Sequence, residues 1–163
     1  MKIIIHGGFF SESSTSHETK VAKQNALMRI AKDSYEFLKT HSALETVVFA
    51  VSQLEDDKLF NAGIGSQIQS DGKIRMSASL MDGFTHKMSG VINIEEVKNP
   101  VQVAQVLLDF DDKVLGGSGA TNFARKHGFE VFSTEIPQRR AEYEAKLASS
   151  GTGTVGCVAL DKD

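Results

Sequence analysis

The sequence predicts an α+β fold, and three kinds of stretch carry that prediction. Two apolar runs near the ends of the chain, 2–5 and 155–160, have the composition of buried β-strands. The stretch from Thr15 to about Thr40 repeats its apolar residues at helical spacing. Between them, Ser70-Asp71-Gly72 is typical of the turn of a β-hairpin, so helices and antiparallel strands are expected in one chain.

Composition limits the class of protein. A length of 163 residues suits one domain with a real core, and 40% hydrophobic with 24% charged residues is ordinary for a globular protein. The net charge of −3 and the lack of any Lys/Arg run longer than two argue against nucleic-acid binding. The apolar run at the start is too short for a signal peptide or a membrane span, so we expect a cytoplasmic protein without membrane contact. The single cysteine, Cys157, cannot form an internal disulfide and is expected to be a small core residue.

The first 51 residues predict one strand and one long helix. The strand 2–5 leads into Gly7-Gly8, and His6 beside it is expected to make structural hydrogen bonds. Thr15 and Glu18 have the spacing of a capping box at the start of the helix. The run 47–51 is compatible with a strand or with the tail of a helix, because five apolar residues in a row do not reveal a period.

The segment 54–66 combines acidic residues with the sequence Asn-Ala-Gly-Ile-Gly. Such a looped backbone can present carbonyl oxygens to a hard cation. The alternative is an acidic turn followed by a glycine-rich connection with no ligand. The residues alone leave both interpretations open.

The middle of the chain predicts a hairpin, a further strand and a second helix. Antiparallel strands are expected at 67–69 and 73–76, another turn at Asp82-Gly83, and a strand at 89–94. Asn99 and Pro100 are typical of a helix cap and its first residue. Its predicted buried face comprises Val103, Val106, Leu107 and Phe110.

The segment 114–128 reads as a strand, a glycine loop and a helix from Thr121 to His127 closed by Gly128. This outline resembles a phosphate cradle, but it lacks the residues of a P-loop and the Gly-x-Gly-x-x-Gly spacing, so a tight turn is expected. A short strand at 130–133 and a charged helix at 137–147 follow. The small polar run 148–151 is typical of a linker.

Thr154 could carry chemistry if the bond after Gly153 were cut. A freed α-amine has a pKa of about 8, so near neutral pH it can act as a base toward the hydroxyl of its own residue. Gly153 leaves its carbonyl open to attack by that hydroxyl, because it has no Cβ. The alternative is that Thr154 only begins a core strand after a loop.

Six motifs, taken together and in order, resemble the plant-type L-asparaginases, or isoaspartyl peptidases, of the N-terminal nucleophile hydrolases. They span nearly the whole chain and comprise residues 5–8, 54–65, 81–83, 99–101, 119–124 and 153–161. The resemblance implies a four-layer αββα sandwich, incomplete in this chain. It also implies a precursor that cleaves itself before a threonine.

The resemblance assigns roles to individual residues. Thr154 would be the nucleophile and, after cleavage, the base, with Asn61 positioning it. Residues 1–153 would be the α-chain portion of a single domain, with a linker at about 137–153, and residues 154–163 the truncated start of the β chain. A structural sodium ion would bind the backbone carbonyls of Leu54, Glu55, Asp57, Phe60, Ala62 and Ile64; no catalytic cofactor is implied.

The implied activity is hydrolysis of the side-chain amide of L-asparagine and of β-aspartyl dipeptides. The implied partners are the chain's own β chain and a second αβ unit in a dimer. Two other interpretations stay open: a related aspartylglucosaminidase or threonine aspartase, and an inactive structural subunit without the β-chain part of the site. Phe9-Phe10 and Met76-Ser77 depart from the family pattern, and the oxyanion-hole and substrate-binding residues of the family have no counterpart before residue 163.

Overall fold

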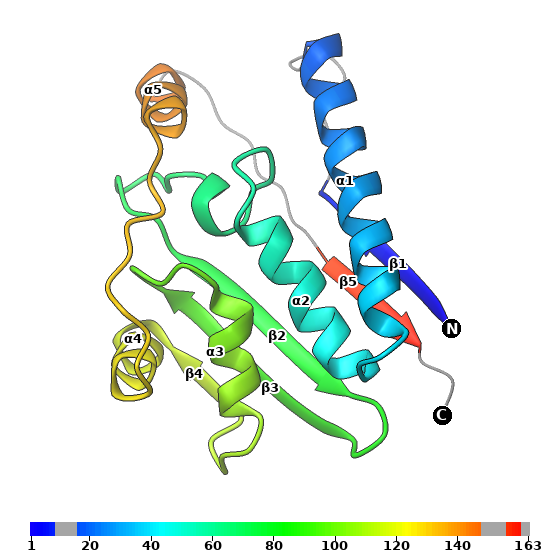
Figure 1. Ribbon diagram of the computed structural model, residues 1–163. Helices are drawn as coiled ribbons and strands as arrows, with labels where there is room; N and C mark the ends of the chain where they lie inside the picture. The colour runs from blue at the N-terminus through cyan, green and yellow to red at the C-terminus, as the bar shows by residue number, and fades with distance from the viewer. Residues whose placement is uncertain (9–15, 148–155, 161–163) are drawn as a thin grey trace.

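The computed structural model describes residues 1–8, 16–147 and 156–160, and it has a mixed α/β architecture (Figure 1). This confirms the predicted mixture of helices and strands. In chain order the elements are β1 (Lys2–His6), α1 (His17–Leu38), α2 (Ala43–Glu55), the 3₁₀ turn η1 (Gly63–Gly65), β2 (Met76–Asp82), β3 (Lys87–Ile94), α3 (Pro100–Leu107), β4 (Val114–Gly116), α4 (Gly117–Lys126), α5 (Pro137–Lys146) and β5 (Gly156–Leu160).

The strands form two small sheets. In one sheet β3 lies between β2, to which it is antiparallel, and β4, to which it is parallel. The parallel pair arises because α3 crosses over between β3 and β4, a connection that the predicted hairpins did not include. In the other sheet β1 pairs antiparallel with β5, with Ile3 opposite Ala159.

The helices α1 to α4 lie on one face of the strands, as Figure 1 shows. One cluster of buried side chains joins β2 and β3 to α3 and α4, and it includes Val91, Ile94 and Leu107. A second lies between α2, α3 and β2, and a third joins α1 to α2 through Ile30 and Leu54. The core therefore lies between the helical layer and one face of each sheet.

The outer strands differ from the prediction of full burial. Ile5 packs toward α1 and α2, but Ile4 is 72% exposed, and its partner Val158 on β5 is 69% exposed. Side chains alternate between the faces of a strand, so these two point away from the helices. Among the described residues no element covers that face, and the expected four-layer sandwich stays a prediction. Within this chain β5 has a partner strand, because β1 pairs with it.

Both long helices begin at a serine. The side chain of Ser16 accepts a hydrogen bond from the backbone N–H of Thr19, so the cap of α1 lies one residue beyond the predicted Thr15, which is outside the described residues. Ser42 and Glu45 form a reciprocal capping box at the start of α2. The ambiguous run 47–51 lies inside α2, because this cap and the helical apolar face fix the period.

The glycine turns are confirmed more often than the strands beside them. The turn at Ser70-Asp71-Gly72 forms, since Gly72 N donates to Gln69 O at 2.9 Å, but the flanking residues 67–75 form no ladder long enough to be strands. The sheet hairpin is instead β2 and β3, joined at the Asp82-Gly83 turn. Residues 130–133 are irregular, so the strand predicted there is wrong.

Two predicted helices also differ in detail. In α3, Val103 and Leu107 are buried as expected, whereas Phe110 lies beyond the helix and is 42% exposed. The helix α4 begins at Gly117, so the predicted glycine loop is its first turn. Gly128 follows α4 with a φ of 84°, a conformation that favours glycine after a helix.

Candidate active site

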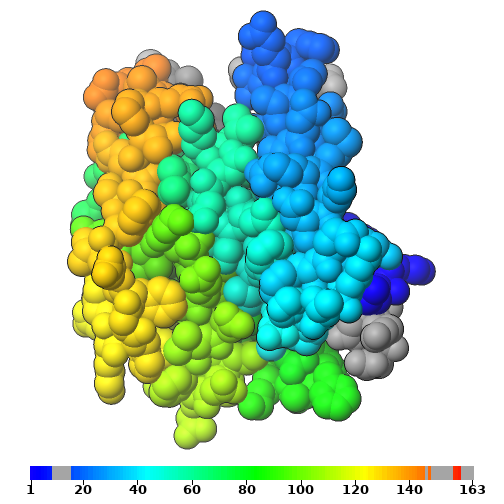
Figure 2. Space-filling view, in the orientation of Figure 1, coloured from blue at the N-terminus to red at the C-terminus, as the bar shows by residue number. Residues whose placement is uncertain are grey.

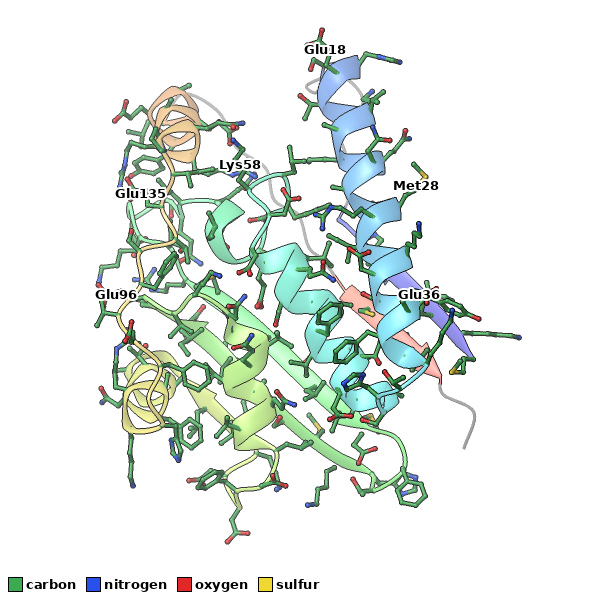
Figure 3. The ribbon with its side chains drawn as sticks, viewed as in Figure 1. Glu18, Met28, Glu36, Lys58, Glu96 and Glu135 are labelled. Carbon is green, nitrogen blue, oxygen red and sulfur yellow. The ribbon has the colours of Figure 1, made fainter. Side chains whose placement is uncertain are left out.

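The loop after α2 carries Asn61 and is closed by that residue's side chain. The Oδ1 atom of Asn61 accepts a hydrogen bond from the backbone N–H of Gln67 at 2.9 Å. Earlier in the loop, the carboxylate of Asp57 accepts from Leu59 N at 3.0 Å, and the ring of Phe60 is fully buried. Local hydrogen bonds and one buried aromatic anchor therefore shape the backbone around Asn61. In Figure 3 the label of Lys58 marks this loop, between α5 and α1.

Two glycines in this loop make contacts that no other residue could make. A Cβ on Gly63 would lie 2.1 Å from the carbonyl oxygen of Glu55, and one on Gly65 would lie 1.9 Å from that of Phe60. Gly63 also has a φ of 50°, in the region that favours glycine. The spacing of the Asn-Ala-Gly-Ile-Gly motif thus reflects close approach of backbone to backbone.

The carbonyl oxygens of the same loop are the candidate cation ligands. Those of Asp57 and Ala62 each accept one backbone hydrogen bond, which leaves each a second lone pair, and that of Leu54 accepts from the N–H groups of Asp56 and Asp57. Within the described part of the chain no hydrogen bond to the carbonyls of Glu55, Phe60 and Ile64 is found. Hard cations such as sodium prefer oxygen ligands, so this donor set fits one. Among the described residues no group of three or more His, Cys, Asp or Glu side chains is placed to hold a metal ion.

The side chain of Glu55 lies beneath this loop and is 3% exposed. Its Oε1 accepts a hydrogen bond from the backbone N–H of Val101 at 3.1 Å, and its Oε2 is buried without a partner among the described residues. Burial raises the pKa of Glu55 to about 8, although the hydrogen bond from Val101 opposes that rise. Glu55 therefore caps the start of α3, the role that was predicted for Asn99. The side chain of Asn99 donates instead to Ser52 O and Asp56 Oδ1.

A cavity of about 1320 Å³ lies between the Asn61 loop and the strands. Its lining includes Asn61 and Glu55 together with Gly156 and Cys157 of β5. Gly153 and Thr154, the predicted cleavage site and nucleophile, lie outside the described residues. Gly156 nevertheless brings the strand that follows Thr154 in the sequence to the same cavity as Asn61.

The remaining residues singled out from the sequence have simpler surroundings. Burial raises the pKa of the Cys157 thiol to about 11, in keeping with a thiol that stays protonated. His6 is exposed on β1, and no hydrogen bond of its side chain is found within the described part of the chain, so its expected structural role stays a prediction.

Sequence reasoning missed two side chains that contact the loop. The sequence singled out Glu55 only for its backbone carbonyl. The burial of its side-chain carboxyl depends on α3, 46 residues later. Arg139 of α5 donates from Nε to Gly65 O at 2.7 Å, across 74 residues. Nothing in the charged segment around Arg139 distinguishes it from its neighbour Arg140.

No helix in the described ranges is long and apolar enough to cross a membrane.

The chain is similar to known hydrolases over almost its whole length. The family model described as Asparaginase matches residues 1–145. An isoaspartyl peptidase/L-asparaginase of Synechocystis is 38% identical over 179 residues, which cover 98% of this chain and 54% of the relative. A plant-type L-asparaginase of Pyrococcus furiosus is 38% identical over 153 residues, covering 91% of this chain and 49% of that protein. An isoaspartyl peptidase of Escherichia coli is 36% identical over 183 residues, covering 99% of this chain and 57% of that protein.

The chain therefore spans about half the length of the curated relatives that it matches. Matches of more than 30% identity to nearly all of this chain, together with a family model covering residues 1–145, agree with the order of motifs along the sequence. On these grounds the chain belongs to the asparaginase family, which includes isoaspartyl peptidases and plant-type L-asparaginases.

Proposed function

We propose that this chain is the nucleophile-bearing part of a threonine amidohydrolase that cleaves itself and then hydrolyses L-asparagine and β-aspartyl dipeptides. One observation carries the proposal: Asn61 and Gly156 line one cavity. Gly156 follows Thr154 by two residues, which a chain spans in about 7 Å at most. The names of the relatives support the choice of substrates, since they are called L-asparaginases and isoaspartyl peptidases.

Self-cleavage would begin with attack of the Thr154 hydroxyl on the carbonyl carbon of Gly153. The C–N bond breaks, a C–O ester bond forms, and the hydroxyl proton ends on the nitrogen of Thr154. Water then hydrolyses the ester, which leaves a carboxylate on Gly153 and returns the hydroxyl to Thr154. The freed amine stands beside the hydroxyl and can accept its proton in the next reaction.

In turnover, the hydroxyl of Thr154 would act on the substrate in the same way. The hydroxyl of Thr154 attacks the side-chain carbonyl of asparagine, the nitrogen leaves as ammonia, and water hydrolyses the acyl-enzyme ester to aspartate. In a β-aspartyl dipeptide the leaving group is the α-amine of the second residue. Asn61, held by its bond to Gln67, would orient the threonine, and the carbonyls of the loop would hold a structural sodium that takes no part in the chemistry.

The rest of the family architecture belongs to the same proposal. A second sheet and helical layer would cover the face that carries Ile4 and Val158, giving the αββα sandwich. Since the chain spans about half of its relatives, the residues that complete the site are expected in sequence beyond these motifs, and pairs of αβ units would form the dimer.

The test starts from the protein as its gene encodes it. Mass spectrometry and N-terminal sequencing are expected to find a product that begins at Thr154. Thr154→Ala is expected to abolish both that product and ammonia release, whereas Thr154→Ser keeps a hydroxyl and retains slow cleavage. A product that begins elsewhere, or an active Thr154→Ala variant, would show that the proposal is wrong.

Substrate choice needs parallel assays of asparagine, β-aspartyl dipeptides and glycosylated asparagine. Preference for the glycosylated substrate would favour an aspartylglucosaminidase. A folded protein that neither cleaves itself nor hydrolyses any of the three would favour a structural subunit.

A further inference from the structure

The helix α5 is attached to the loops near the site through two side chains of one face. Arg139 Nε donates to the carbonyl of Gly65 at 2.7 Å, and the hydroxyl of Tyr143 donates to the carbonyl of Ser70 at 3.2 Å. Residues four apart lie on the same side of a helix, so both bonds leave α5 in one direction. In Figure 1, α5 stands beyond the sheets, above the loop that follows α2. The space-filling view shows this helix at the end of the molecule where α1 begins (Figure 2).

The hydrogen bond made by Arg139 is partly buried, and its charge is balanced by a neighbouring carboxylate. Its side chain is only 12% exposed, and its Nη1 pairs with Oε2 of Glu142 at 2.6 Å. A shielded cation loses its hydration and needs such partners, and its hydrogen bond to a carbonyl is stronger than one between neutral groups. The backbone oxygen of Gly65 therefore accepts a charge-assisted hydrogen bond, which is stronger than one from a neutral donor.

The neighbouring Arg140 provides a contrast within the same helix. Its side chain is 37% exposed and pairs with Glu135, only five residues away, at 2.6 Å. Such a surface pair contributes little and joins no distant part of the chain. Both arginines are thus paired, but only Arg139 connects α5 to the Asn61 loop.

Gly65 lies inside the ring that Asn61 closes. The ring runs from Asn61 to Gln67, whose N–H donates to Asn61 Oδ1, and within it Gly65 N donates to Ala62 O at 3.0 Å. A Cβ on Gly65 would lie 1.9 Å from the carbonyl oxygen of Phe60, so the backbone of Gly65 packs directly against another part of the same loop. A force that holds the Gly65 carbonyl therefore also limits the movement of Asn61.

We propose that Arg139 is a positioning residue, which fixes the side chain of Asn61 by anchoring the Gly65 carbonyl from α5. This inference rests on the proposed function, because its effect on rate needs Asn61 to act on Thr154. Without the anchor, the loop samples other arrangements and Asn61 spends less time in the productive one. The substrate itself touches neither Arg139 nor Gly65 in this scheme, so substrate affinity is not expected to change.

The experiment compares self-cleavage and turnover in the protein as its gene encodes it, for wild type, Arg139→Met, Arg139→Lys and Arg140→Met. Arg139→Met keeps the apolar stem and loses every donor, and we expect about a tenfold fall in cleavage rate and in kcat with KM unchanged. Arg139→Lys keeps the charge but not the planar fork, and is expected to lie between Met and wild type. Arg140→Met is the matched control and keeps wild-type values.

Several outcomes separate this inference from the proposed function. A wild-type protein that never yields a product starting at Thr154 overturns both. If wild type cleaves and Arg139→Met matches it in cleavage rate and kcat, only the role of Arg139 is wrong. Equal losses in Arg139→Met and Arg140→Met also overturn it, because they would reflect general damage to α5. If Arg139→Met does not fold, Arg139→Lys decides: a several-fold slower reaction supports the role, and the wild-type rate contradicts it.

Discussion

The carboxyl of Glu55, the last residue of α2, accepts a hydrogen bond from the backbone N–H of Val101, near the start of α3, at 3.1 Å. The first N–H groups of a helix have no partner within the helix, and Pro100 has no N–H at all. Glu55 therefore supplies from 46 residues away the cap that Asn99 does not supply. The end of one helix holds the start of another, directly below the Asn61 loop.

Removing this long-range cap should destabilise the fold. Glu55→Ala leaves the N–H of Val101 buried without a partner, and we expect a loss of about 2–3 kcal/mol in the free energy of unfolding measured in urea. Glu55→Gln keeps an acceptor of the same shape and should lose much less. The exposed Glu36, which pairs with Lys39 on the surface, offers a control whose replacement by alanine changes little. Equal stability of Glu55→Ala and wild type would contradict the capping role.

The glycines of the loop are expected to be irreplaceable for steric reasons. Gly63→Ala should cost more than about 1–3 kcal/mol, because it adds a clash with the Glu55 carbonyl to a strained φ of 50°. Gly119, in the first turn of α4, has no atom within 4 Å of the Cβ position, so Gly119→Ala should be neutral or stabilising. Urea unfolding of the two variants side by side tests this pair. A Gly63→Ala variant as stable as wild type would show that the loop is not packed as described.

Asn61 should matter more for rate than for stability. Asn61→Leu removes the acceptor for Gln67 N and the amide that would orient Thr154, so we expect self-cleavage to slow by about 100-fold or more. Its effect on unfolding should be about 1 kcal/mol, the usual value of one hydrogen bond. The appearance of the Thr154 product on a gel and a parallel urea titration measure the two quantities. Wild-type cleavage in Asn61→Leu would remove Asn61 from the site.

Sodium should stabilise the protein if the loop carbonyls bind it. A ligand that binds only the folded state raises stability with the logarithm of its concentration, by about 2.7 kcal/mol at 100 times its dissociation constant. We expect a higher Tm in sodium chloride than in tetramethylammonium chloride at equal ionic strength. Gly119→Ala should keep this response. An identical Tm in both salts across a range of concentrations would argue against a sodium site.

The thiol of Cys157 should react slowly at neutral pH. Burial raises its pKa to about 11, and since the thiolate is the reactive form, only about one molecule in a thousand is reactive at pH 8. Its alkylation rate should rise about tenfold per pH unit between pH 8 and pH 10. In urea the same cysteine, the only one in the chain, should titrate near pH 8.5. A folded protein whose rate levels off near pH 8.5 would mean that the thiol is solvated.

Much of the local structure could be predicted because its causes are local. Turn chemistry identifies the bends at Asp71-Gly72 and Asp82-Gly83, and Pro100 marks the start of α3. The motif order indicates the family and singles out Asn61 and the carbonyl-rich loop. The sodium, the cleavage at Thr154 and the nucleophile stay predictions, the last two because those residues lie outside the described ranges.

The sequence by itself determined the turns, most helices, the mixed class and the family, because capping, glycine conformations and motif spacing act over a few residues. Only the tertiary structure decided which groups meet across long separations: β1 with β5, Glu55 with Val101, and Arg139 with Gly65. Such pairs depend on how helices and sheets pack. The sequence does not distinguish one arginine or glutamate of a helix from another, because the difference lies in how far the folded surroundings exclude water. Exposure of Ile4 and Val158 has the same origin, since an apolar strand is buried only on faces that another layer covers.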